Sequence, residues 1–564
     1  MSEKKKIAYF SMEIAIDPRM PTYGGGLGVL AGDVIRSFAD LRIPAVGVTL
    51  LCNKGYFFQQ LGPDGNQIEV PADWKPGDFM QRVEPKIKVP LGGREITVQC
   101  WRYNEVGRNE SSVPVLFLDT DVGENDGEAR GISAYLYGKD LRYRLMQEIV
   151  LGIGGVRMLS ALGYGDMDVY HMNEGHTAFL IVELLKKYGM PIDETGLEAM
   201  REKCVFTTHT PVPAGHDVFP KEMVREALGR YLNDGEIDFL CANGDNTKLN
   251  MTLMALHFSH YVNGVAKKHA EISKSMFPGY PIDSITNGVH HVFWTSKPFR
   301  SLYDRKILGW RDDPCLMRYA INLSDEEIMG THDECKKELI DHINRTKNAG
   351  MDYHTFTIGY ARRITRYKRP TLLLRDLGRL DSLDVQVVYA GKAHPNDTDG
   401  KEEIKSIIGA SRELKNVRLV FLENYDMKLA KMIISGSDLW LNTPHAPYEA
   451  SGTSGMKAAL NGVPSLSALD GWWLEGHIES ITGWSIGERV REGDEVNDAD
   501  DSEKLYSKLE NEIMPKYYGE KSAWANVMKY SIGINGSFFN SHRMVQQYVV
   551  KAYGRNGSGE NDLS

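Results

Sequence analysis

Short apolar runs alternate with longer amphipathic or mixed stretches along most of the chain. In the first half we predict strands over residues 6–10, 43–51, 113–121, 166–172, 204–210 and 283–289, with an antiparallel hairpin strand over 94–103. A second series follows residue 350, with strands over 355–361, 385–393, 417–424, 437–444 and 463–469 and a helix over 401–414. Buried strands that alternate with helices are typical of βαβ units. The pattern therefore predicts an α/β fold with parallel sheets.

The two series of strands indicate two domains, because a chain of 564 residues is too long for one hydrophobic core. Residues 290–314, rich in Pro, Trp and charge, separate the series, so we place the boundary near residue 295. We expect domains over 1–294 and 295–528, followed by a last helix and a tail over 529–564. The acidic segment 491–504 is expected to be a solvated loop and the tail 554–564 to be disordered.

The charge balance limits the partners. The chain carries 66 basic and 76 acidic side chains, a formal charge of −10, which argues against broad binding to nucleic acid or an anionic membrane. No apolar run approaches the roughly 18 to 20 residues that span a bilayer. The six cysteines lack C-x-x-C spacing and no histidine pair has the helical spacing of a metal site, so neither disulfides nor a metal are expected. We expect a soluble protein of the reducing cytoplasm. Because the net charge is negative, any phosphate-binding site must be a local concentration of positive charge.

A glycine-rich stretch, "TYGGGLGVLAGD" over 22–33, precedes a helical pattern. Gly26, Gly28 and Ala31 fit the dinucleotide pattern G-x-G-x-x-A, but no acidic residue follows at the distance that a ribose contact needs. Glycines also let backbone amides at a helix start approach an anion. Contact with a phosphate or a sugar is the favoured interpretation, and a flexible turn is the alternative.

Two polar clusters follow predicted strands, at the edge of a parallel sheet where ligands bind. "HMNEGHTAF" contains Asn173, Glu174 and His176, and "TTHTPVPAGHD" contains His209, His216 and Asp217. Histidines in such places bind sugar hydroxyls or orient catalytic groups, although a lone histidine is more often satisfied inside a core. Asn287, in "ITNGV", is either another ligand or a turn residue.

Positive charge is concentrated after the strand at 355–361. "YARRITRYKRP" places Arg362, Arg363, Arg366, Lys368 and Arg369 within eight residues. In an acidic chain this density favours a bidentate anion such as phosphate, with a solvated face as the alternative. Not all five side chains can face one anion, so some must point outward.

The segment "EASGTSGMKAALNG", residues 449–462, places Lys457 in a short helix that Thr453 or Ser454 can cap. A lysine among small residues is accessible as a nucleophile, and a nearby cationic cluster can lower its pKa toward the neutral form that condenses with an aldehyde. The combination suggests pyridoxal phosphate, whereas an ordinary surface lysine is the commoner outcome.

At these segments the chain resembles the α-glucan phosphorylases, the glycogen, starch and maltodextrin phosphorylase family. "EASGTSGMKAALNG" is similar to the family's pyridoxal phosphate segment E-A-S-G-T-x-x-M-K-x-x-L-N-G. "GGLG", "NEGHTA", "HTPVP", "TNGV", "RRITRYKRP" and "AGKAHP" resemble further family motifs in the same order, and the length resembles the compact bacterial and archaeal branch.

The resemblance implies two facing Rossmann-like domains of the GT-B glycosyltransferase type, with the active site in the cleft between them and a last helix that crosses back to the first domain. By the same resemblance Lys457 would bind pyridoxal 5'-phosphate covalently. Thr453, Ser454 and Arg362 would lie near the cofactor phosphate, and Arg363 and Lys368 would bind the substrate phosphate. His209 would act at the glucosyl unit, and substrate contacts would come from Gly26, Leu27, His176, Asn287, Glu449, Ser451 and Gly452.

The implied reaction is phosphorolysis of an α-1,4-glucan from its non-reducing end, giving α-glucose 1-phosphate with retention. The partners would be the glucan and inorganic phosphate, without the regulatory sites of longer members, and by analogy a homodimer. Two other hypotheses remain at this stage. One is a nucleotide-sugar glucosyltransferase of the starch synthase kind, and the other is a catalytically silent carbohydrate-binding protein.

Overall fold

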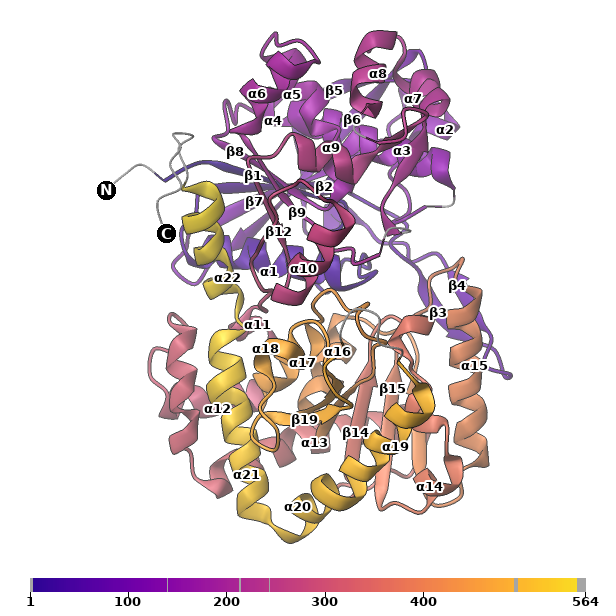
Figure 1. Cartoon of the computed structure of the whole chain (residues 1–564), viewed down its shortest axis with the longest axis vertical. Helices are drawn as coiled ribbons and strands as arrows, with labels where there is room; N and C mark the ends of the chain where they lie inside the picture. The colour runs from indigo at the N-terminus through magenta and orange to yellow at the C-terminus, as the bar shows by residue number, and fades with distance from the viewer. Residues whose placement is uncertain (1–3, 139, 213–214, 243, 491–495, 555–564) are drawn as a thin grey trace.

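The computed structural model describes residues 4–138, 140–212, 215–242, 244–490 and 496–554. Figure 1 shows two bodies stacked along the long axis, each built around one sheet. The upper body holds the nine-stranded sheet and the lower body the six-stranded sheet. Each sheet has a buried apolar core, so the polar clusters at the strand ends are left at the edges of the cores.

The nine-stranded sheet has the order β13-β12-β9-β8-β1-β2-β7-β6-β5. Its neighbouring strands are parallel from β13 to β7, and β5 and β6 are antiparallel, which confirms the hairpin strand predicted over 94–103. β5 and the four-residue β12 were not predicted from the sequence. The strands are β1 (Ile7–Ser11), β2 (Ala45–Leu50), β5 (Gln81–Leu91), β6 (Arg94–Val106), β7 (Ser112–Asp119), β8 (Val169–Asn173), β9 (Cys204–Thr207), β12 (Tyr261–Gly264) and β13 (Asp283–Ser284).

Helices cover this sheet, and the first of them begins directly at the glycine-rich stretch, as expected. They are α1 (Gly26–Asp40), α2 (Gly127–Arg130), α3 (Leu141–Ile149), α4 (Gly155–Ala161), α5 (Leu180–Lys187), α6 (Glu194–Arg201), α7 (Lys221–Leu228), α8 (Asp234–Cys241), α9 (Met251–His257) and α10 (Lys267–Met276). A small two-stranded sheet, β10 (Val218–Pro220) with β11 (Lys248–Asn250), lies among them.

The six-stranded sheet is parallel throughout, in the order β16-β15-β14-β17-β18-β19. Its strands are β14 (Phe356–Ala361), β15 (Val385–Ala390), β16 (Arg418–Leu422), β17 (Leu439–Asn442), β18 (Ser465–Ala468) and β19 (Gly483–Ile486), of which β19 was not predicted. Its helices are α13 (Asp325–Lys347), α14 (Leu377–Asp381), α15 (Thr398–Glu413), α16 (Met427–Gly436), α17 (Ser454–Ala459), α18 (Trp473–Gly476), α19 (Asp498–Lys508), α20 (Met514–Gly519) and α21 (Lys521–Tyr530).

The region between the two series of strands is helical rather than an open linker. It forms α11 (His291–Trp294), α12 (Lys297–Lys306) and a 3-10 stretch over Pro314–Asn322. Phe299, Leu302 and Trp310 are buried in the core of the six-stranded sheet. The Pro, Trp and charged residues of this region therefore shape short helices that pack onto that core.

The last helix, α22 (Ser541–Tyr548), lies against the nine-stranded sheet although the helices before it belong to the other body (Figure 1). Met544, Val545 and Tyr548 are buried together with Ile7 of β1. The Ser541 hydroxyl forms a hydrogen bond of 2.6 Å with that of Ser37 on α1. The C-terminal chain thus joins the two bodies a second time.

A hairpin forms a further contact between the bodies. Its strands, β3 (Phe58–Leu61) and β4 (Gln67–Val70), leave the nine-stranded sheet and lie beside α15 (Figure 1). The side chain of Gln67 donates to the Ala393 carbonyl (2.9 Å) and accepts from the Ala393 amide (3.0 Å). This contact holds the loop that follows β15.

The prediction of a solvated loop over 491–504 is wrong from residue 498 onward. Residues 491–495 lie outside the described part of the chain, and α19 begins at Asp498. Asn497 caps the helix, and the aspartates of its first turn suit the positive end of the helix dipole. Arg369 forms ion pairs with Asp498 (3.0 Å) and Asp501 (2.7 Å).

The tail predicted to be disordered falls outside the described residues from 555 onward. In the part of the chain that the structure describes, no helix is long and apolar enough to cross a membrane.

Candidate active site

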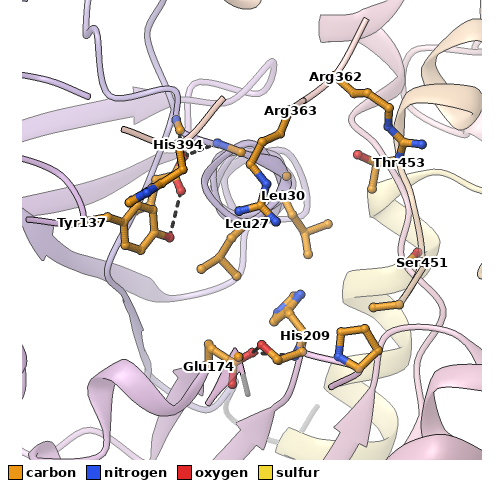
Figure 2. A pocket seen from close by; sticks show the side chains of 18 of the residues that line it. Leu27, Leu30, Tyr137, Glu174, His209, Arg362, Arg363, His394, Ser451 and Thr453 are labelled. Carbon is orange, nitrogen blue, oxygen red and sulfur yellow. Dashed lines mark hydrogen bonds between the residues drawn. The ribbon is translucent and has the colours of Figure 1, made fainter. Parts of the chain in front are cut away.

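One cavity of about 980 Å³ opens between the two bodies. The loops that follow β1, β8, β9 and β13 contribute to it from one side, and those that follow β14, β15 and β17 from the other. Every residue that the family resemblance assigned to the site lines this cavity: Gly26, Leu27, His176, His209, Asn287, Arg362, Arg363, Lys368, Glu449, Ser451, Gly452, Thr453, Ser454 and Lys457. Of the other candidates in the two polar clusters, Glu174 and Asp217 line it as well, whereas Asn173 and His216 do not. Figure 2 shows Arg363 and His209 pointing toward one another across it, with Leu27 and Leu30 on the helix behind them.

Lys457 lies on α17 and is only 4% exposed, so it is not a surface lysine. Its Nζ lies 3.9 Å from the centre of the Trp294 ring. Burial lowers the pKa of its amine to about 8, Asp33 opposes this shift and Arg36 adds to it. The sequence prediction attributed a lowered pKa to a nearby cationic cluster, whereas burial is the main cause. The capping prediction is right in position, since Thr453 is the N-cap residue, but the Thr453 side chain makes no cap hydrogen bond.

The Trp294 ring beneath the lysine is held from the other body. The indole Nε1 donates to Asp33 Oδ2 (2.8 Å) on α1, and Asp33 Oδ1 accepts from Arg36 (3.1 Å). A second amine, that of Lys431 on α16, lies 3.3 Å from the centre of the Phe293 ring, and burial lowers its pKa to about 7. The lysine pocket is thus aromatic and joins both bodies.

The basic cluster after β14 divides into three parts. Arg362 and Lys368 both donate to Glu449 Oε2, at 2.9 and 2.5 Å. Arg366 is exposed and Arg369 pairs with α19, so both point away from the cavity, as the sequence argument required of some members. Arg363 faces the cavity, and the described residues give it no carboxylate within ion-pair distance. It is therefore the cation that is available to an anionic ligand.

Glu449 is a buried carboxylate with two cationic partners. Burial alone would raise its pKa, but the ammonium of Lys368 and the guanidinium of Arg362 lower it to about 2. Its backbone amide donates to Asp470 Oδ2 (2.8 Å), and burial raises the pKa of Asp470 to about 7. At neutral pH Glu449 is charged and keeps Lys368 in place.

On the opposite wall Glu174 organises the histidine loop. Its Oε2 accepts from the His209 amide (2.8 Å) and the Thr210 hydroxyl (2.9 Å), and Glu174 itself has a left-handed backbone with φ of 74°. A strained non-glycine residue of this kind often marks a functional site. His209 Nε2 lies 2.7 Å from Asn173 Oδ1, and burial lowers the pKa of His209 to about 4. The imidazole is therefore neutral at pH 7, and because Nε2 donates, Nδ1 is an acceptor.

Two further polar atoms in this wall lack partners. Among the described residues, His176 Nδ1 and Asn287 Oδ1 are buried without a hydrogen bond, although both side chains line the cavity. Asp217 holds the other ring nitrogen of His176 (3.2 Å) and also accepts from Arg144 (3.0 Å). Unpaired buried polar atoms are costly unless a ligand pairs with them. They fit the hydroxyl groups of a sugar.

The sequence analysis missed several residues of the cavity. Glu13, Tyr137, Arg144 and His394 line it, yet none was selected. Glu13 stands in the apolar stretch after β1, where one charged residue among hydrophobic ones was a usable indication. Arg144 lies in an ordinary helical pattern, so only the tertiary structure reveals it.

Away from the cavity, Asp40, His290 and His542 bring their ligand atoms within 4.8 Å of one another. Asp40 Oδ2 lies 3.0 Å from His290 Nε2 and 3.3 Å from His542 Nε2. His290 Nδ1 accepts from the Phe293 amide (3.1 Å), so Nε2 carries the ring proton and donates to Asp40. The group is therefore a hydrogen-bonded cluster that ties α1 to α11 and α22.

The parallel sheets, and a cavity walled by loops from both, define an α/β glycosyltransferase-like protein. The carbohydrate phosphorylase family model matches residues 236–499. A maltodextrin phosphorylase of Thermococcus litoralis is 40% identical over 98% of this chain and 71% of its own. A glycogen phosphorylase of Mycobacterium bovis is 36% identical over 97% and 70%. An uncharacterized protein of Methanocaldococcus jannaschii is 33% identical over 97% of this chain and its full length. The chain belongs to the carbohydrate phosphorylase family.

Proposed function

We propose that this protein releases α-glucose 1-phosphate from the non-reducing end of α-1,4-glucans, with inorganic phosphate as the attacking group and retention at the anomeric carbon. The observation that carries the proposal is one cavity that holds a buried amine, Lys457, and a guanidinium, Arg363, to which the described residues give no carboxylate partner. Buried polar atoms that lack hydrogen bonds within the described part of the chain face the same cavity and suit a sugar. Membership of the carbohydrate phosphorylase family supports it.

The residues around Lys457 fit pyridoxal 5'-phosphate. A buried amine with a pKa of about 8 has a much larger neutral fraction near neutral pH than an ordinary lysine, and the neutral form is the one that condenses with an aldehyde. The Trp294 ring offers a flat apolar face beside it. Thr453, Ser454 and Arg362 would hold the cofactor phosphate. When bound, the cofactor supplies through its phosphate a group that gives a proton to the substrate phosphate and takes it back.

The chain's own residues supply the remaining electrostatics. Arg363 and Lys368 would hold the substrate phosphate, and the ammonium of Lys368 is already oriented by Glu449. Cationic groups fixed in advance stabilise developing negative charge without reorganisation, an effect of the order of 3 to 4 kcal/mol per donor. Anionic groups beside the glucosyl unit favour the positive charge that develops there during transfer.

The opposite wall would bind the glucosyl unit. Because Asn173 fixes the tautomer of His209, Nδ1 of that ring is an acceptor for a sugar hydroxyl. His176 and Asn287 would add contacts through their unpaired atoms. Gly26, Leu27, Glu449, Ser451 and Gly452 would complete the substrate contacts.

We further propose that the two bodies are the domains of a GT-B glycosyltransferase, over 1–294 and 295–528, and that 529–564 returns to the first domain. The burial of Met544 and Val545 beside β1 supports the return. The six cysteines are free thiols, which fits a reducing cytoplasm. A homodimer is proposed only by analogy with the family.

A spectrum and one assay test the proposal. The purified protein should show a near-ultraviolet or visible pyridoxal band and form glucose 1-phosphate from maltodextrin and phosphate, and Lys457→Ala should abolish both. Lys392→Met is the matched control, because burial also lowers the pKa of Lys392 to about 8 although it does not line the cavity. A protein without the band, inactive after incubation with pyridoxal phosphate but active with a nucleotide sugar, would instead be a glucosyltransferase.

A further inference from the structure

The glycine loop at the start of α1 is not free to present all its amides to an anion. The Gly24 and Gly25 amides donate to Glu13 Oε1, at 2.9 and 3.2 Å, and Tyr137 donates its hydroxyl to Oε2 (3.0 Å). Glu13 is 1% exposed and lies in the wall of the cavity. A protein carboxylate therefore occupies part of the place that the sequence pattern assigned to a phosphate.

Glu13 and the loop fit each other closely. A Cβ atom on Gly28 would overlap the Glu13 side chain, so the absence of a side chain at 28 makes room for this carboxyl group. A Cβ on Gly25 or Gly26 would meet nothing within 4 Å. Of these three glycines, only Gly28 is required for packing, because a side chain at that position would overlap Glu13.

The charged surroundings of Glu13 connect it to the anion site. Burial raises its pKa to about 7, while the hydrogen bonds from Gly24, Tyr137 and Gly25 and the field of Arg363 oppose the rise. The other titratable groups that interact with it are Tyr23, Tyr56 and Cys52, whose pKa values burial raises, so they stay neutral. Arg363 is thus the charged group that influences Glu13.

We propose that Glu13 is a positioning residue for phosphate binding. It accepts from two amides of the glycine loop and so turns them away from the cavity, and the anion is bound by Arg363 instead. Glu13 takes up a proton when that anion binds. The inference rests on the proposed function. Its physical basis is that a bound anion cancels the field of Arg363 and adds negative charge beside the carboxyl group, and both effects favour the protonated form. The proton comes from solvent and stays on Glu13 until phosphate leaves.

Isothermal titration of the holoenzyme with inorganic phosphate, in buffers of different ionisation enthalpy, measures the proton uptake. At pH 7 the wild type should take up about half a proton more than Glu13→Gln, because a group with a pKa near the pH is half protonated beforehand. Glu13→Gln keeps an acceptor for the two amides, so its KM for phosphate should stay within about 3-fold. Glu13→Ala should raise that KM by about 10-fold or more with a smaller change in kcat, a 10-fold change being about 1.4 kcal/mol.

Glu183→Gln is the matched control, since Glu183 is likewise a buried carboxylate that accepts from a tyrosine hydroxyl, but it does not line the cavity. Its proton uptake should equal that of the wild type. If Glu13→Ala does not fold, Tyr137→Phe serves instead: loss of the hydroxyl donor should move proton uptake to higher pH.

Equal proton uptake in wild type and Glu13→Gln would overturn the inference, as would an unchanged KM in Glu13→Ala or an unshifted profile in Tyr137→Phe. These outcomes leave the proposed function intact. A wild type that neither binds phosphate nor forms glucose 1-phosphate contradicts the proposed function itself.

Discussion

At the scale of single residues, burial and local partners decide which charged groups of the cavity can react. Lys457 and Glu449 belong to one segment, yet their pKa values move for different reasons. The amine forms no ion pair with a carboxylate in the described part of the chain and loses proton affinity through burial. The carboxylate has two cationic partners that outweigh its burial. The sequence predicted that both residues belong to the site, but it attributed the lowered pKa of the lysine to nearby cations and not to burial, which is the main cause.

Lys457 should react with aldehydes at a lower pH than an ordinary lysine. Its pKa falls from 10.5 to about 8, so the neutral amine appears as pH rises through 8. Borohydride trapping of pyridoxal on cofactor-free protein, followed by peptide mass spectrometry, should give a midpoint near pH 8 at Lys457. An exposed lysine such as Lys428 supplies the comparison in the same digest. A midpoint above 10 at Lys457 would contradict the buried environment.

Glu449→Gln should destabilise the protein by about 3 to 5 kcal/mol, because it leaves Arg362 and Lys368 buried without a counter-charge. Urea unfolding measures the loss. The more exposed pair Lys347–Glu423 gives the control, and Glu423→Gln should cost no more than about 1 kcal/mol.

The pH dependence of this pair has a definite sign. The pKa of Glu449 is depressed in the folded state, from 4.5 to about 2, so its contribution is complete above pH 4.5 and is lost as pH falls through 2. Between those values the stability of the wild type should fall more steeply with acid than that of Glu449→Gln. If the free energy of unfolding fell equally steeply with acid in the wild type and in Glu449→Gln, the result would argue against the ion pair.

At the scale of elements, the hydrophobic pattern predicted most strands of both sheets and the start of α1. It missed the four-residue strands β12 and β19, and it missed β5, in which two prolines and several charged residues obscure the strand pattern. It also missed α19, whose first turn is acidic. In that helix the capping Asn497 and the ion pairs to Arg369 replace the apolar contacts that a pattern would reveal.

Gly28→Ala tests the fit between α1 and Glu13. The added methyl group overlaps the Glu13 side chain, so the variant should lose about 1 to 3 kcal/mol and raise the KM for phosphate. Thermal unfolding and phosphate kinetics measure the two effects. Gly330→Ala in the interior of α13 meets nothing within 4 Å and should gain about 0.5 to 1 kcal/mol. Normal stability and kinetics in Gly28→Ala would refute the fit.

At the scale of the whole molecule, several contacts hold the two bodies around the cavity. The hairpin formed by β3 and β4 contacts the loop after β15, α22 returns to α1, and Trp294 joins Asp33 to the lysine pocket. None of these contacts follows from sequence spacing, because each joins residues more than 250 positions apart. They set the distance between the walls and therefore the shape of the site.

Gln67→Ala should loosen the loop after β15. It removes two hydrogen bonds to Ala393 and leaves buried backbone groups unpaired, a loss of about 1 to 3 kcal/mol in local stability. Hydrogen exchange should show faster exchange of the Ala393 amide, with weaker phosphate binding because His394 lines the cavity. Gln81→Ala, at an exposed hydrogen bond to Arg102, is the control and should change neither. Unchanged exchange at Ala393 would show that the hairpin does not restrain this loop.

The sequence by itself determined the α/β class, the family resemblance and many, though not all, of the residues that meet in the cavity, because strand periodicity and segments such as 449–462 are local properties. Only the tertiary structure decided which groups act on one another. Glu13 faces the glycine loop, and Asp33 holds Trp294 beneath Lys457. Glu449 pairs with Lys368 and Arg362, while Arg363 has no carboxylate partner among the described residues. The physical reason is that burial and electrostatic interactions depend on distance in space, and chain order does not fix that distance.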